Sequence, residues 1–410
     1  MKNTRQAILP IIGCLIVQMC VGIIYLWSVF NSAVVASFDW TANAAKMVSS
    51  YMLLGFVTGS LAGGFLNDKK GPKFTATIGV ILFAAGVALT GLLTRDSIAL
   101  MYLTYCAMGG MGSGFAYSAC ISCVQKWMPH KRGLASGLAA SAFGLSTVLF
   151  APLSKWLMGI FTDDAGLVVF KPVFLILAAT FFTAGIIGCI LIKRPSAEYT
   201  KQLTQSVPAA ATGRDLTLGQ AVKKVPFWCI FFSIFFMNGT WNLAVPMIYD
   251  LGMERGLSAA AATFCVSFTG VPNAAGRLVM AAVSDKIGRA RSVGILAAAT
   301  AVCALLLTFV GGYGFIVVIA VTAFAYGGPS AINAAMNTDF FGAKNSGTNY
   351  GVIMLSLGLS SVFFNFVASR FLDGAIVPTF IMAAVTAVIA IGMMVIIEIC
   401  QKRERAQTQE

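Results

Sequence analysis

Charged side chains are scarce in this sequence, and their scarcity excludes an ordinary soluble fold. Only 10% of the 410 residues are Asp, Glu, Lys or Arg, whereas 58% are hydrophobic. A soluble chain of this length needs a far higher share of charged residues to stay dispersed in water. Most of the protein's surface is therefore expected to face a medium other than water.

Histidine is nearly absent, which argues against an enzyme. The one histidine, His130, lies beside Lys131 and Arg132, a setting that does not suggest a catalytic triad or an ordinary metal site. Cysteine is not rare, at ten residues, but the C-x-x-C pair Cys120 and Cys123 falls in an apolar run, where thiols stay protonated and inert. We expect no catalytic residues, no metal and no cofactor.

Long apolar runs are what the sequence has instead. Runs of about 18 or more apolar residues recur along the whole chain, and each is long enough to cross the ~30 Å hydrocarbon layer as a helix. The first run carries no charge and lacks a convincing cleavage site, so we expect it to be retained rather than removed as a signal peptide. The sequence therefore predicts an all-α membrane protein with twelve transmembrane helices. The expected spans are residues 7–30, 46–66, 72–94, 99–125, 133–158, 168–192, 224–249, 258–283, 290–312, 314–337, 348–369 and 375–399.

The excess of positive charge indicates membrane topology. The formal net charge is +13, which by itself would suggest a nucleic-acid partner. The Lys and Arg residues are concentrated, however, in every second loop and at the two ends of the chain, as the positive-inside rule requires of cytoplasmic segments. We therefore expect a multi-pass protein of a bacterial-type plasma (inner) membrane, surrounded by lipid, with both termini in the cytoplasm and no nucleic-acid partner.

A polar segment divides the spans into two sets of six. Residues 194–223 contain no apolar run and are expected to form a cytoplasmic linker between an N-terminal six-helix bundle (1–193) and a C-terminal one (224–410). Short motifs recur in both halves, since "AFGLS" at 142–146 matches "SLGLS" 214 residues later. At this offset Gly133 pairs with Gly347, and Gly137 pairs with Gly351. The pattern predicts a duplicated carrier with two pseudo-symmetric halves.

Two loops share the pattern D-K-x-G, in "GFLNDKKGPK" (64–73) and "AAVSDKIGRA" (281–290). Asp68 and Asp285 are placed to cap a neighbouring helix N-terminus, and the adjacent Lys69 and Lys286 to form ion pairs on the same face. Such contacts would act as a latch between the bundles. An ordinary basic loop is the alternative. The loops resemble the signature of the major facilitator superfamily, which implies two six-helix bundles that rock about a central site.

Arg277 is the only charged residue between Leu257 and Val283. It lies eight residues before Asp285, or about 12 Å of helix, and an arginine that faces lipid at such depth is costly. No Asp or Glu is expected at a comparable depth in any span. Because the guanidinium fork suits a carboxylate, we expect the substrate to supply the anion. The alternative is an arginine that reaches the membrane surface or has a purely structural role.

Other polar and aromatic residues fall near the middle of the expected spans. Thr269 and Asn273 precede the buried arginine at intervals of four, so they are expected on the same helix face. Tyr25, Tyr117 and Tyr326 lie in other spans, where each hydroxyl can donate one hydrogen bond to an anion. We predict that all five contribute to the substrate site. Contacts between helices are the alternative for each of them.

Several stretches resemble a narrower family. They are "KWMPHKRGLASGLAASAFGLS" (126–146), "NAAGR" (273–277), "SDKIGR" (284–289) and "NYGVIMLSLG" (349–358). They look like the oxalate:formate antiporter family and the related bacterial and animal monocarboxylate transporters, and the likeness covers nearly the whole chain. In these families an arginine of the eighth span binds the carboxylate, which implies the same role for Arg277.

Two departures from these families refine the expected substrate and its coupling. Oxalate carriers have a second cation, a lysine, in the eleventh span, where this chain has Leu357. A dianion would therefore keep one uncompensated charge in a cavity of low dielectric constant. Animal monocarboxylate carriers have an aspartate four residues before the arginine, whereas this chain has Asn273, which cannot titrate.

The sequence thus predicts a monomeric secondary transporter of a small carboxylate anion such as lactate, pyruvate or formate. We expect a proton as the coupling ion, and since no side chain is a candidate to carry it, proton and anion would move together as the neutral acid. Anion exchange of the oxalate:formate type is an alternative. A drug-efflux facilitator is less favoured, because such pumps place acidic residues in large apolar cavities.

Overall fold

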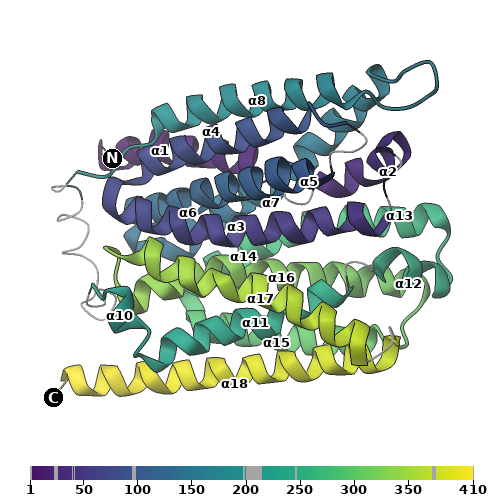
Figure 1. Cartoon of the computed structure of the whole chain (residues 1–410). Helices are drawn as coiled ribbons and strands as arrows, with labels where there is room; N and C mark the ends of the chain where they lie inside the picture. The colour runs from purple at the N-terminus through teal and green to yellow at the C-terminus, as the bar shows by residue number, and fades with distance from the viewer. Residues whose placement is uncertain are drawn as a thin grey trace. The chain divides into compact units, whose positions relative to one another are not determined.

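The computed structural model describes residues 2–22, 26–38, 40, 42–94, 98–196, 199, 215–244, 247–371 and 375–409. In this part of the chain the regular elements are helices (Figure 1), and the one pairing of extended backbone is an isolated bridge between Thr162 and Val168. The predicted all-α class is therefore confirmed.

The chain divides into two compact units. The first unit comprises residues 1–128, 142–203 and 346–351, and the second comprises 129–141, 204–345 and 352–410. The first turns of α7 (Arg132–Ile160) therefore belong to the second unit, and those of α17 (Ser346–Phe371) belong to the first. The bundle boundary within residues 194–223 stays a prediction.

In the first unit, the most extensive helix pair is α3 (Ala42–Lys70) with α6 (Gly110–Trp127). Helix α4 (Pro72–Thr90) packs against α6 and α8 (Phe170–Leu191), and α1 (Lys2–Val21) also packs against α6 and α8 (Figure 1). Shorter elements complete this unit. They are α2 (Trp27–Phe38), α5 (Ile98–Met101) and the π-helix η2 (Tyr102–Gly109).

In the second unit, α14 (Gly270–Ile287) packs against α16 (Gly312–Phe341). Helix α15 (Arg289–Leu306) packs against α16 and α18 (Ile376–Gln409), and α11 (Val225–Ala244) packs against the same two helices. The short elements here are η3 (Pro129–Lys131), α10 (Leu218–Ala221), α12 (Ile248–Glu254) and α13 (Ala259–Phe268).

Nine helices among the described residues are long and apolar enough to cross a membrane, and they coincide with nine of the predicted spans. The other three, 7–30, 99–125 and 258–283, each contain more than one helical element. The boundaries lie between α1 and α2, where the π-helix η2 passes directly into α6, and at Thr269 between α13 and α14. At the second and third boundaries the residues keep helical backbone angles, so the chain changes its type of helical turn there without leaving the helix.

The four glycines paired by sequence have equivalent packing roles. A Cβ at Gly133 of α7 would overlap the carbonyl oxygen of Ala281 on α14. A Cβ at Gly347 of α17 would likewise overlap the carbonyl oxygen of Gly64 on α3, and Gly137 and Gly351 make similar close approaches one turn further on. Only glycine lets two backbones come this close. The paired glycines therefore allow an equivalent close helix crossing in each unit.

Candidate substrate-binding site

Arg277 is buried in the second unit, near the middle of α14, with 4% of its surface exposed. Its Nε donates a hydrogen bond to Oδ1 of Asn273 at 2.9 Å, and its Nη1 donates to the backbone carbonyl of Ala140 at 3.3 Å. Both acceptors are uncharged, so these two bonds orient the guanidinium and add no negative charge beside it. A cation held in this way is suited to bind an anion.

Close packing on two sides positions α14. A Cβ at Gly276 would overlap the carbonyl oxygen of Phe324, so α16 lies directly against this helix. On the α7 side, Oγ of Ser141 donates to the carbonyl of Ala274 at 2.8 Å. These contacts bring the carbonyl of Ala140, which is 137 residues away in the sequence, within reach of the arginine.

Hydrogen bonds among the described residues link two of the three members of the predicted polar stripe on α14. Asn273 is buried and bonded to Arg277, as its spacing of four residues implies. Thr269 lies at the junction of α13 and α14, and its hydroxyl donates to the carbonyl of Val266 at 2.8 Å. The described bond of Thr269 is thus local, and its part in substrate binding stays a prediction.

Tyr326 of α16 stacks on an aromatic residue that the sequence analysis did not single out. Its ring lies 5.0 Å from that of Trp241 on α11, at an interplanar angle of 19°. Leu357 lies on α17 and is half-buried. Trp241 had no distinguishing signal in the sequence, because a tryptophan in an apolar span is most often a packing residue.

Tyr117 belongs to the first unit, where it is 2% exposed. Its ring meets Phe56 and Phe143 edge to face, with centroids 5.2 Å away in both cases. The structure thus places Tyr117 in an aromatic cluster. Tyr25, the remaining predicted tyrosine, lies outside the described residues.

Asp68 caps a helix, as its loop motif predicts. It lies near the end of α3, and its carboxylate accepts the backbone N–H groups of Gly347 at 3.3 Å and Thr348 at 2.7 Å. These groups belong to the first turn of α17, where N–H groups have no partner within their own helix. A carboxylate at this position also interacts favourably with the helix dipole.

Asp285 makes the equivalent cap in the second unit. Its two oxygens accept the N–H groups of Gly133 at 2.9 Å and Leu134 at 2.8 Å, in the first turn of α7. These positions precede Gly347 and Thr348 by the 214-residue offset of the internal repeat. The repeat therefore extends from sequence to hydrogen bonding.

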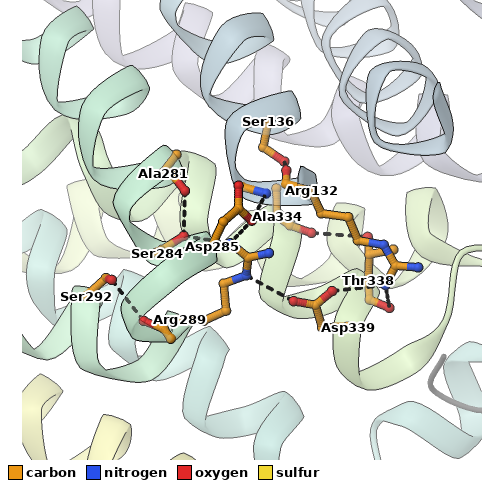
Figure 2. Close-up of polar contacts among 12 residues, drawn as sticks. Arg132, Ser136, Ala281, Ser284, Asp285, Arg289, Ser292, Ala334, Thr338 and Asp339 are labelled. Atoms are coloured by element: carbon orange, nitrogen blue, oxygen red, sulfur yellow. Dashed lines mark hydrogen bonds and ion pairs between the residues drawn. The ribbon is translucent and has the colours of Figure 1, made fainter. Parts of the chain in front are cut away.

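An ion network surrounds the second cap (Figure 2). Arg289 forms ion pairs with Asp285 at 2.6 Å and with Asp339 of α16 at 3.0 Å. Arg132 of α7 pairs with the other oxygen of Asp339 at 2.9 Å and donates to the carbonyl of Thr338 at 3.3 Å. The four charged side chains are between 10% and 25% exposed, so water screens them less than surface pairs.

Sequence reasoning missed the cations of this network. It assigned the pairing role to Lys69 and Lys286, which are exposed, whereas the ion pair of Asp285 is made by Arg289. The spacing of four residues between Asp285 and Arg289 was a usable signal. Arg132 and Asp339 are 207 residues apart in the sequence, so no local sequence pattern indicated that they form an ion pair.

Comparison with known proteins identifies a family. The sequence profile of the Major Facilitator Superfamily matches residues 11–364 and 230–409. Among solved structures, the proton:xylose symporter XylE superposes with a TM-score of 0.73 at 15% identity, covering 96% of each chain. At this identity the match establishes the fold alone.

Two curated relatives are similar over most of their length. An oxalate:formate antiporter of Oxalobacter formigenes is 26% identical over 357 residues, which cover 86% of this chain and 82% of the relative. The apicoplast pyruvate carrier 1 of Toxoplasma gondii is 24% identical and covers 84% of this chain and 72% of the relative.

Proposed function

Because the chain belongs to the major facilitator superfamily of membrane transporters, we propose that it carries small monocarboxylates, with Arg277 binding the carboxylate. The observation that carries this proposal is the guanidinium of Arg277, buried and held by the neutral acceptors of Asn273 and Ala140. A carboxylate can accept two parallel hydrogen bonds from such a fork.

The number of cations in the expected site favours a monoanion. Leu357 occupies the position where oxalate carriers have a lysine, and no Lys or Arg occurs between Lys344 and Arg370. A dianion would keep one charge unpaired away from water, which is strongly unfavourable. The relative named as a pyruvate carrier supports a monocarboxylate such as pyruvate, lactate or formate.

The proposal also covers the coupling ion, the oligomeric state and the orientation of the protein in the membrane. The protein works as a monomer in a bacterial-type inner membrane, with both termini in the cytoplasm, as the distribution of Lys and Arg implies. Transport proceeds by alternating access and uses the proton gradient. The relative named as an oxalate:formate antiporter makes anion exchange the second candidate.

The two helix caps form the proposed latch. Asp68 and Asp285 each bind the first turn of a helix that lies more than 150 residues away in the sequence. Their bonds must break if these helix ends separate during transport. We assign them to the cytoplasmic face, and Lys69 and Lys286 keep a supporting electrostatic role there.

Uptake of labelled L-lactate into proteoliposomes tests the function. An inward proton gradient should stimulate uptake, and an excess of oxalate should leave it unchanged. Uptake that ignores the gradient and is blocked by oxalate would instead support the anion exchanger and contradict the charge-counting argument.

Replacing Leu357 by lysine should admit a dianion. The new cation would pair with the second carboxylate of oxalate, so oxalate uptake relative to lactate uptake should rise by about tenfold or more. Competition between the two labelled substrates measures this ratio. Leu357→Met introduces an unbranched side chain of similar length to lysine but without the charge, so it should leave selectivity unchanged. An unchanged ratio in Leu357→Lys would show that this position does not face the substrate.

A further inference from the structure

A fully buried asparagine in the second unit has unused hydrogen-bonding capacity. Asn333 of α16 is 0% exposed, and neither its Oδ1 nor its Nδ2 has a hydrogen-bond partner among the residues that the structure describes. Buried polar groups are nearly always satisfied, because an unpaired amide away from water is unfavourable. A donor and an acceptor left over on one side chain point to a ligand from outside the chain.

Two ring contacts show which face of α16 carries this amide. Tyr326 stacks on Trp241 of α11, and Phe341 meets Phe227 of the same helix at a centroid distance of 5.8 Å. Asn333 lies seven residues after Tyr326 and eight before Phe341. These spacings return to the same side of a helix. The asparagine therefore lies on the face of α16 that meets α11, between the two aromatic contacts.

The amide is displaced along α16 from the carboxylate site. A Cβ at Gly327 would overlap the carbonyl oxygen of Asn273, so this part of α16 lies beside the group that orients Arg277. Asn333 follows Gly327 by six residues, or about 9 Å of helix. The displacement is toward Asp339 and its ion network, the end that we assign to the cytoplasm. A substrate that moves inward from Arg277 would thus come to Asn333 next.

The chemistry of the amide distinguishes two forms of the substrate. A carboxylate has only acceptors, so it would satisfy Nδ2 and place a negative oxygen against Oδ1. An undissociated carboxylic acid has an O–H donor beside a carbonyl acceptor. Its O–H can donate to Oδ1 while its carbonyl accepts from Nδ2, which closes a ring of two hydrogen bonds. The unpaired groups of Asn333 therefore match the neutral acid.

We propose that Asn333 is a second substrate site that binds the undissociated carboxylic acid, an inference that rests on Arg277 being the carboxylate site. A carboxylate bound to Arg277 takes a proton from hydronium, which forms the O–H bond of the acid and releases water. The loss of charge breaks the ion pair, and the neutral acid moves to Asn333. On leaving, it returns the proton to water as hydronium and becomes the anion again.

This route couples transport to protons without a titrating side chain. Helix α11 contains no charged residue from Val225 to Ala244. The charged groups on the other elements around this region are Arg277 and Asp285 on α14, Arg289 on α15, Arg132 on α7 and Asp339 on α16. All of these except Arg277 pair within the ion network. Because Asn333 is wholly buried, the acid reaches it only when the packing around it opens during the transport cycle.

The substitution Asn333→Leu tests the proposed acid site independently of the carboxylate site at Arg277. It removes both hydrogen bonds and keeps the branching of the side chain at Cγ, so proton-driven L-lactate uptake should fall by about tenfold or more. Binding of lactate at Arg277, measured as protection of the detergent-solubilised protein against thermal unfolding, should change by less than about twofold. Thr322→Val is the matched control, since Thr322 is equally buried on α16 and its hydroxyl donates to the carbonyl of Val318 in the same helix. It should leave uptake unchanged.

Lactamide provides a test that needs no variant. This neutral analogue carries no anion for Arg277, but its primary amide pairs with Asn333 through the same two hydrogen bonds as the acid. Lactamide should inhibit L-lactate uptake by the wild-type protein and should not inhibit the residual uptake of Asn333→Leu. Failure to inhibit the wild-type protein overturns the proposal, even if Asn333→Leu does not fold.

The two proposals fail in different ways. If lactate binds and is transported, but Asn333→Leu transports at the wild-type rate or uptake ignores the proton gradient, then the acid site is wrong and the carboxylate site stands. If lactate neither protects nor is taken up by the wild-type protein, then the function proposed for Arg277 fails and the acid site fails with it.

Discussion

Replacing Arg277 by glutamine should abolish saturable lactate uptake, with a loss of at least about hundredfold. Glutamine keeps a hydrogen-bonding group but removes the charge, so the carboxylate would enter a buried site unpaired, at a cost of about 3 kcal/mol or more. Arg277→Lys restores the charge without the planar fork, and we expect it to recover only part of the activity. Initial rates in proteoliposomes, over a range of lactate concentrations, measure both effects.

The control for this prediction is the same substitution at an exposed arginine. Arg291 pairs with Glu398 at 2.8 Å, and 63% of its side chain is exposed. Surface pairs of this kind contribute little to stability, so Arg291→Gln should transport lactate normally. Near-normal uptake by Arg277→Gln would mean that the buried cation has a structural role, and the proposed carboxylate site would be wrong.

Removal of the two caps should have unequal effects on stability. Asp285→Ala takes away two helix-capping bonds and the ion pair with Arg289, so it should lower the free energy of unfolding by about 3 kcal/mol or more. Asp68→Ala removes two capping bonds and a 3.4 Å hydrogen bond from Nδ2 of Asn67, but no ion pair among the described residues. Its cost should be about 1–2 kcal/mol.

Denaturant titration of the detergent-solubilised variants measures this difference, because both caps have the same geometry and differ in the ion pair. Glu398→Ala, which breaks an exposed pair, should change stability by less than about 1 kcal/mol. Equal losses in Asp68→Ala and Asp285→Ala would show that the ion network adds nothing to the second cap.

Much of the fold was predictable because membrane insertion depends on local properties. Apolar runs give the spans, and nine of them recur as continuous helices. The π-helix η2 at the start of one expected span was not predictable, since the type of helical turn leaves the hydropathy of a segment unchanged. The motif-bearing carboxylates Asp68 and Asp285 were assigned to helix caps from sequence, and both make such caps. Their partner helices are distant in sequence and could not be named.

The candidate site was likewise predictable only in part. A single arginine in an apolar span is easily recognised in the sequence, and the spacing of four residues links Arg277 to Asn273. The carbonyl of Ala140 is a backbone group, identical in every residue, so no sequence pattern could select it. Asn333 was overlooked for a different reason: an asparagine in a span is commonplace, and it becomes informative only because the described part of the chain offers its amide no hydrogen-bond partner.

The sequence by itself determined that this protein is a multi-span membrane transporter with an arginine inside an apolar span and two capping loops. Those features depend on which residue types follow one another over short distances. Only the tertiary structure decided which groups lie beside them: the acceptors of Arg277 and the helices capped by Asp68 and Asp285. It also showed that the Asn333 amide has no hydrogen-bond partner among the described residues. These depend on how helices pack, because packing brings together groups more than a hundred residues apart and can leave a buried amide without a partner.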